Sequence, residues 1–159
     1  MAAAVARLLP PLQETFEDPA LSRRLDRMLQ MTDARPDQGV CVAGPEAGDA
    51  MSGLWRRGYS RVEAARRCTC GCADEKCGVL LVLGGSSAEA LADLVEAVSP
   101  MLASGGRLAI SAHELISGEE RLRLCNRLAH RGFRYHPKAH LETILLATKP
   151  GPEDFVPAN

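Results

Sequence analysis

The chain is poor in aromatic side chains and has no dominant charge. Phe, Trp and Tyr make up only 4% of its 159 residues, so a hydrophobic core has to be built from Leu, Val, Ala and Ile. The formal net charge is −1, which excludes an overall positive field that would attract nucleic acid or an anionic membrane. The length suits one domain with a sizeable core, and a content of 46% apolar residues is ordinary for a globular protein.

Long apolar runs are missing as well. The strongest runs, residues 79–83 and 144–147, are far too short to cross a bilayer. The first residues contain an apolar patch, but prolines and acids follow it and no small-residue cleavage site stands out, so we expect no secretory signal. These absences predict a cytoplasmic protein that is not bound to a membrane.

Several signatures of known active sites are also absent. The chain has no phosphate-loop pattern of Gly-Lys followed by Ser or Thr, and no Ser-His-Asp or Cys-His arrangement is apparent. Arginines are frequent in residues 56–67 and 121–134. Because stacking aromatics are scarce, we interpret both stretches as solvated faces, and a DNA- or RNA-associated regulator is the weakest of three functional hypotheses.

Residues 1–38 are predicted to form a helical segment in front of the main body. Asp18 followed by Pro19 is typical of a helix start. One face of the helix is apolar and carries Leu21, Leu25, Met28 and Leu29. Such a face packs on the sheet of its own chain or on a second subunit, so a homodimer or a protein partner bound through this helix is one expectation.

Residues 39–150 alternate between strand and helix patterns. This alternation predicts an α/β domain with a mostly parallel sheet of about six strands, an antiparallel last strand and helices on both faces. Strands are expected at residues 40–43, 61–67, 78–83, 107–112, 133–135 and 143–148. The short connection before the last strand favours an antiparallel pair. Residues 151–159 are predicted to be a disordered tail.

Three helices are expected between these strands. The first covers residues 50–59, with Met51, Leu54 and Trp55 facing inward. The second begins with a capping box at Ser86, and Pro100 kinks or ends it. The third begins with a capping box at Ser117. Its inward residues are expected to be Leu122, Cys125, Leu128 and Ala129.

The order of these elements resembles that of the class I S-adenosylmethionine-dependent methyltransferases. Residues 78–149 are similar to the second half of that family, with Leu102-Ala103-Ser104-Gly105-Gly106-Arg107 before a strand, the helix end RLAHRGF and a closing hairpin. Residues 40–48 are similar to its first strand and glycine-rich loop. The resemblance implies a Rossmann-like fold that binds S-adenosylmethionine at the carboxyl ends of the strands.

The resemblance also assigns site residues. It implies cofactor contacts for Gly44, Glu46, Gly48, Glu63, Gly84, Gly85 and Ser86, with Glu63 on the ribose hydroxyls. His113 follows a strand at the same end of the sheet. It is either a general base or, as the more ordinary interpretation, a polar loop histidine.

Two departures from the family bear on activity. The glycine-rich loop has only Gly44 and Gly48, with Pro45 and Glu46 between them and no acid at the end of the preceding strand. Only residues 68–77 connect the second predicted strand to the next, too few for the family's third strand and its two helices, so that region of the fold is missing. The sequence therefore leaves open a small methyltransferase and a non-catalytic binding or assembly module on the same fold.

Four of the six cysteines lie within ten residues, in the pattern C-x-C-x-C-x4-C. These residues are Cys68, Cys70, Cys72 and Cys77. Four thiolates can close a structural zinc site, although thiols two residues apart in an extended chain point to opposite sides. Free thiols and a regulatory disulfide are the alternatives. Cys41 and Cys125 fall within apolar patterns and are interpreted as buried thiols.

Overall fold

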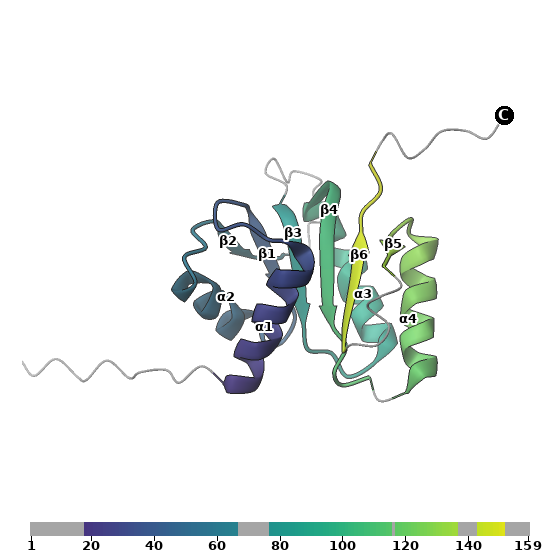
Figure 1. Cartoon of the computed structure of the whole chain (residues 1–159). Helices are drawn as coiled ribbons and strands as arrows, with labels where there is room; N and C mark the ends of the chain where they lie inside the picture. The colour runs from purple at the N-terminus through teal and green to yellow at the C-terminus, as the bar shows by residue number, and fades with distance from the viewer. Residues whose placement is uncertain (1–17, 67–76, 116, 137–142, 152–159) are drawn as a thin grey trace, which may run out of the picture.

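The computed structural model describes residues 18–66, 77–115, 117–136 and 143–151. They form a six-stranded sheet with the order β2-β1-β3-β4-β6-β5 (Figure 1). The strands are β1 (Val40–Ala43), β2 (Val62–Ala64), β3 (Cys77–Leu83), β4 (Leu102–Ser111), β5 (Arg134–Tyr135) and β6 (Ile144–Thr148). The helices are α1 (Pro19–Thr32), α2 (Ala47–Arg56), α3 (Ala88–Val98) and α4 (Gly118–His130), and a 3₁₀ turn, η1 (Ser99–Met101), follows α3.

The sheet is mostly parallel, as the sequence predicts. β1 pairs in parallel with β2 on one side and with β3 on the other, and β3 pairs in parallel with β4. β6 is antiparallel to both β4 and β5, which confirms the antiparallel last strand. The strand order reverses between β1 and β3, and parallel sheets bind ligands beyond the carboxyl ends of the strands at such a point. In Figure 1 the carboxyl ends of β3 and β4 point to the bottom of the view.

β2 is the outermost strand on its side of the sheet among the described residues. The family's third strand would pair beyond it, and no strand of the described ranges does so. The connection from β2 to β3, residues 67–76, lies outside those ranges.

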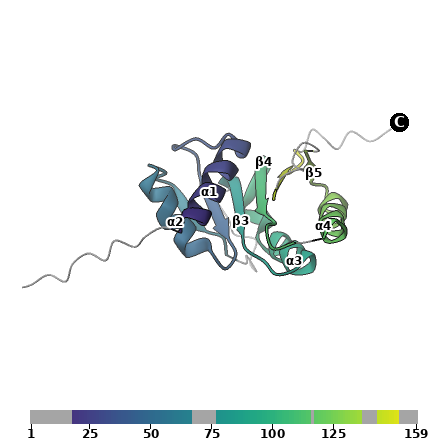
Figure 2. The same cartoon turned by 60° about the horizontal axis from the view of Figure 1, so that its bottom comes forward.

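The helices cover the two faces of the sheet in pairs. Figure 2 shows α1 and α2 on one face and α3 and α4 on the other. Strand side chains alternate between the two layers, so Val40 and Val42 pack with α1 and α2, whereas Cys41 and Ala43 face α3. All four residues of β1 are buried, as expected from its continuous apolar run.

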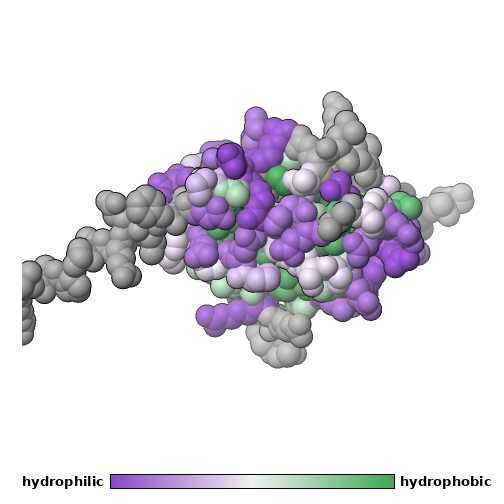
Figure 3. Space-filling view, turned by 90° about the horizontal axis from the view of Figure 1, so that it is seen from below, coloured by the Kyte–Doolittle hydropathy of each residue, from purple (hydrophilic) through white to green (hydrophobic). Residues whose placement is uncertain are grey.

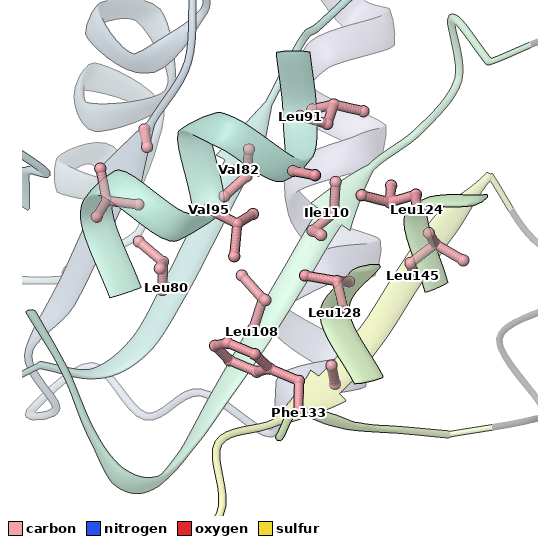
Figure 4. Close-up of a cluster of buried hydrophobic side chains, with 14 of the residues drawn as sticks. Leu80, Val82, Leu91, Val95, Leu108, Ile110, Leu124, Leu128, Phe133 and Leu145 are labelled. Carbon is pink, nitrogen blue, oxygen red and sulfur yellow. The ribbon is translucent and has the colours of Figure 1, made fainter. Parts of the chain in front are cut away.

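The core between the sheet and α3 and α4 is built from aliphatic side chains (Figure 4). Strand residues meet helix residues there, and the largest contributors are Leu80, Val82, Leu91, Val95, Leu108, Ile110, Leu124 and Leu128. Phe133 is the only aromatic residue of this buried cluster within the described ranges. The scarcity of aromatic residues in the sequence thus appears directly in the composition of the core.

α1 begins and packs as the sequence predicts. Asp18 caps it, because its Oδ1 atom accepts a hydrogen bond from the Ala20 N–H at 2.9 Å. Leu21, Leu25 and Met28 are buried in the layer between the helix and the sheet. The apolar face of this helix is therefore used within its own chain.

The caps of α3 and α4 follow the sequence with one correction. The cap of α3 is Ser87 and not Ser86, since the Ser87 hydroxyl accepts from Ala90 N–H at 3.1 Å. Ser117 caps α4 as predicted, accepting from Glu120 N–H at 3.2 Å. α3 ends at Val98 before the turn that contains Pro100, as a proline requires.

The inward faces of α2 and α4 agree with the prediction in part, since Leu54, Cys125 and Leu128 are buried as expected. α2 begins three residues earlier than expected and turns Ala50, Gly53 and Leu54 inward, leaving Trp55 54% exposed. In α4 the inward side chains are Leu124, Cys125 and Leu128, and Leu122 is 57% exposed. Ala129 is also exposed. The inward side chains are spaced i, i+3 and i+4 in α2 and i, i+1 and i+4 in α4, and in each helix they form one face.

β4 starts earlier than predicted because it contains an irregularity. Cys77 pairs with Leu102, and Val79 pairs with Arg107, so β4 has five residue steps where β3 has two. The Gly105–Gly106 turn expected from the sequence lies inside this bulge, and the Gly105 N–H donates to the Lys149 carbonyl at 2.9 Å. The regular part of the strand starts at Arg107, as predicted.

Two further findings concern membrane-spanning helices and the two ends of the chain. Within the described ranges, no helix combines the length and apolar character needed to cross a bilayer. Residues 1–17 of the predicted N-terminal segment and residues 152–159 of the predicted tail lie outside the described residues.

Candidate functional site

The ends of β1 and β3 touch at the carboxyl edge of the sheet. Gly44, directly after β1, has φ +106°, and a Cβ atom at this position would lie 2.0 Å from the Leu83 carbonyl oxygen. Only glycine avoids that overlap at this backbone angle. Part of the glycine requirement in this loop therefore comes from the packing of two strand ends.

We call the region directly beyond these strand ends the crevice, and the loop between β1 and α2 lies next to it. Gly84 follows β3 with φ +78°, and a Cβ there would lie 3.3 Å from the ring carbons of Pro45 and 3.4 Å from Glu46 Oε2. The two residues that interrupt the glycine-rich loop thus sit over the end of β3. Gly84 leaves just enough room for them.

Glu46 is held by Arg24 of α1. Glu46 occupies the N-cap position of α2 but makes no side-chain cap hydrogen bond. Its two carboxylate oxygens instead accept from Arg24 Nη2 at 2.7 Å and Nη1 at 2.8 Å. The Arg24 side chain is 14% exposed. Hydrogen bonding to Arg24 lowers the pKa of Glu46, and hydrogen bonding to Glu46 raises the pKa of Arg24.

Two residues at the end of β4 complete this polar cluster. The Ser111 hydroxyl is buried and lies 3.1 Å from His113 Nδ1. Arg24 Nη1 lies 3.2 Å from the same ring nitrogen and 3.5 Å from Ser111 Oγ. His113, the one catalytic candidate of the sequence, is thereby placed beside Glu46, which was assigned to the cofactor.

A cleft of about 720 Å³ opens beside the cluster. We call it the arginine cleft; it is lined by Arg23, Arg24, Arg27, Glu46, His113 and Thr143, among others. One wall is α1, and the other is the start of β6 together with the loop after β4. Figure 3 looks onto this end of the molecule, which is mostly hydrophilic with small hydrophobic patches between the polar side chains.

The other assigned cofactor residues are spread along the same edge. Gly84, Gly85 and Ser86 follow β3, and Gly48 lies in the first turn of α2. Glu63 pairs with Cys41, two residues before β1 ends. Its own strand, β2, ends one residue later, at Ala64.

Three of the four proposed zinc ligands, Cys68, Cys70 and Cys72, lie outside the described residues. The fourth, Cys77, is buried at the start of β3, and its thiol donates to the Met101 carbonyl at 3.3 Å. Within the described ranges, no group of three or more potential ligands gathers in the geometry of a metal site. Cys41 and Cys125 are buried free thiols, as predicted.

Sequence reasoning missed Arg24 and Ser111. A signal for Arg24 was present, since Leu21, Arg24, Leu25 and Met28 follow the spacing i, i+3, i+4, i+7 of one buried helix face. A charged residue inside an apolar stripe needs a partner in the interior. Ser111 ends a buried strand and gave no comparable signal.

The described residues fit one end of S-adenosylmethionine. Arg24 already binds a carboxylate in bidentate geometry next to two glycines that follow strands, and the amino-acid end of the cofactor carries a carboxylate. In this structure the Glu46 carboxylate occupies that position on Arg24. The fit rests on this amino-acid end of the cofactor, and the contact of Glu63 with the ribose stays a prediction.

Comparisons with known proteins agree on the fold. No protein-family model matches the chain. The search of curated proteins also found no match. Among solved structures, a SAM-dependent O-methyltransferase from Thermotoga maritima superposes with a TM-score of 0.53 at 14% identity, covering 80% of this chain and 65% of its own. This chain therefore spans just under two thirds of that enzyme.

Two further structures are similar. Phosphoethanolamine N-methyltransferase 2 from Haemonchus contortus, in complex with S-adenosyl-L-methionine, gives a TM-score of 0.58 at 15% identity, over 89% of this chain and 40% of that one. Geranyl diphosphate C-methyltransferase from Streptomyces coelicolor gives 0.53 at 13% identity, over 80% and 77%. The strand order, the antiparallel last strand and these superpositions show that the chain has the class I methyltransferase-like, Rossmann-like fold.

Proposed function

We propose that the protein binds S-adenosylmethionine in the crevice, with the carboxylate of the cofactor on Arg24. The observation that supports this proposal is the bidentate ion pair of Arg24 with Glu46 at the reversal of strand order. That position is where α/β sheets of this kind bind ligands. The similarity to enzymes described with S-adenosylmethionine adds support through the fold.

In this proposal each residue has a distinct role. Gly44 and Gly84 allow the backbone to approach the ligand closely, and Arg24 exchanges the Glu46 carboxylate for that of the cofactor. The bound cofactor supplies an activated methyl group, and the protein contributes mainly by orienting an acceptor in the arginine cleft. His113 lines that cleft, and an unprotonated ring nitrogen there can accept a proton from the acceptor.

Calorimetric titration with S-adenosylmethionine tests the proposal on four proteins. Wild type is expected to bind weakly because Glu46 competes for Arg24. E46A removes the competitor and should bind about tenfold more tightly, since a charge-assisted hydrogen bond contributes about 1.5 kcal/mol or more. R24A should lose binding. R35A is the matched control, because Arg35 is an exposed arginine in the loop after α1 that pairs with Asp37, and its affinity should equal that of wild type.

The second candidate function is a non-catalytic binding or assembly module on the same fold. The position of Pro45 and Glu46 over Gly84 favours it, since they occupy the crevice. The same titration separates the two candidates: absence of heat at millimolar ligand for both wild type and E46A, with both proteins folded by circular dichroism, overturns S-adenosylmethionine binding. A protein partner of α1 would then contact its polar side, because the apolar side is buried.

A further inference from the structure

A second pocket, of about 700 Å³, opens between the C-terminal halves of α3 and α4. It lies next to the start of β4, and therefore at the end of the sheet opposite to the crevice. Its floor is apolar and consists of Ala92 and Val95 of α3, Leu128 of α4, and Phe133. The last three belong to the buried cluster of Figure 4. Small-molecule sites in proteins have volumes of about 300–1,000 Å³ and mainly apolar walls, so this interhelical pocket has the size and lining of such a site.

One wall of the interhelical pocket is the irregular start of β4. Ser104 lines the pocket and lies between Leu102 and Arg107, where the residues of β4 do not pair regularly with β3. The Lys149 ammonium group holds this wall, since it donates to the carbonyls of Ser99 at 2.9 Å and Leu102 at 2.8 Å. Strand irregularities of this kind are frequent beside functional sites, where they redirect side chains. The wall is therefore fixed in place before a ligand arrives.

The charged groups around the interhelical pocket have partners within the protein. Arg131 pairs with Glu96. Arg127 pairs with Asp93 at 2.8 Å and lies 3.9 Å from Glu96 Oε2. Lys149 is bound to backbone carbonyls. A charged ligand would have to exchange these contacts for its own, whereas a neutral molecule leaves them intact and gains the burial of its apolar surface.

We propose that the interhelical pocket binds a neutral, mostly apolar molecule with one hydroxyl group, of the chemical class of the phenols. The ring of such a ligand packs on Leu128 and Phe133, and its hydroxyl group hydrogen-bonds with the exposed Ser104 hydroxyl on the wall. This site shares no residue with the arginine cleft or the crevice. The proposal is therefore independent of S-adenosylmethionine binding.

Titration of the full-length, isotope-labelled protein with 2-naphthol at neutral pH, followed by NMR, tests the site. Saturable shifts are expected for the backbone amides of Ala92, Ser104 and Phe133, and none for Gly44 and His113 at the other end of the sheet. Shifts at all five amides, or a lack of saturation at the first three, would overturn the proposal. 2-Naphthoate carries a carboxylate on the same ring system and should bind more weakly. Tighter binding of 2-naphthoate would overturn the assignment to a neutral ligand.

Two pairs of variants locate the ligand. A92M fills the floor of the pocket and should abolish the shifts, whereas A90M makes the same change at an exposed position of α3 and should retain them. S104A should weaken binding about fivefold, as expected for one hydrogen bond of about 1 kcal/mol. S60A removes an exposed hydroxyl before β2 and should bind like wild type. Equal effects within either pair would contradict the site, and the serine pair decides if A92M does not fold.

Discussion

Arg24 and Glu46 lie on different elements, and their pairing links α1 to the loop that leads into α2. At the scale of the residue this pair dominates the site, because it is the best-shielded ion pair of the cluster and both side chains are less than one third exposed. The guanidinium keeps the pKa of Glu46 below its ordinary range. The pair should therefore leave a signature in the dependence of stability on pH.

Replacing Glu46 with Gln should lower the free energy of unfolding by about 1–2 kcal/mol at neutral pH. The folded-state pKa of Glu46 is below its unfolded value of about 4.3, so its stabilisation is complete above that value and is lost as the pH falls through the folded pKa. Urea unfolding from about pH 7 down to about pH 2 should show wild type and E46Q converging at the acid end. A constant difference across this range would contradict the prediction.

Gly44 and Gly48 form a matched pair, one in the loop after β1 and the other in the first turn of α2. G44A places a Cβ 2.0 Å from the Leu83 carbonyl oxygen at φ +106°, which should cost about 2 kcal/mol or more. G48A meets no atom within 4 Å and lies in a helix, so it should be neutral or stabilise by about 0.5–1 kcal/mol. Urea midpoints of the two variants check this, and equal effects would mean that the loop is not fixed by strand packing.

At the scale of the element, α1 shows how far the sequence could go. Its cap and its apolar face were predictable because they depend only on residues within one helix. The inward faces of α2 and α4 were only partly predictable, since several apolar residues compete for the contact and the position of the helix on the sheet decides which of them face it. Small side chains such as Ala50 and Gly53 allow α2 to lie close to the sheet, and Trp55 turns outward.

Leu25 tests whether α1 is an integral part of the domain. Its side chain is fully buried, whereas Leu122 on α4 is 57% exposed. L25A should lower the free energy of unfolding by about 2–4 kcal/mol, and L122A should change it by less than about 0.5 kcal/mol. Circular dichroism during urea unfolding should show one transition that moves as a whole. A separate early transition in L25A would indicate that residues 1–38 form an independent unit.

At the scale of the whole molecule, the order of the motifs predicted the fold. Strand, turn and helix patterns alternate along the chain, and only a few topologies are compatible with that order. The site was only partly predictable. Gly44 and Gly84 were recognisable from the sequence as glycines at turns. The Arg24–Glu46 pair was not, because its residues are 22 positions apart and they meet only when α1 packs on the sheet.

The buried thiols report on the integrity of the whole fold. Contact with the Cys77 thiol and then burial raise the pKa of Cys41, and burial raises that of Cys125. In the variant C68S/C70S/C72S the three remaining thiols should react with Ellman's reagent no faster than the protein unfolds, because the thiolate is the reactive form and has to be exposed. The denatured variant should react at once and serves as the control. Modification that outpaces unfolding would show that a thiol is accessible in the folded state.

Arg24 lies along the apolar stripe of α1, where a hydrocarbon side chain would suffice for folding, whereas the proposed ligand needs the guanidinium. A leucine at this position would extend the hydrophobic contact with the sheet. Replacing a partly buried ion pair with hydrophobic side chains often leaves the stability unchanged. The double variant R24L/E46Q should therefore have the same melting temperature as the parent protein but a much lower affinity for anions. Equal thermal stability of the two proteins would mean that folding alone does not require the arginine, so its place in the helix would be explained by the anion that it binds.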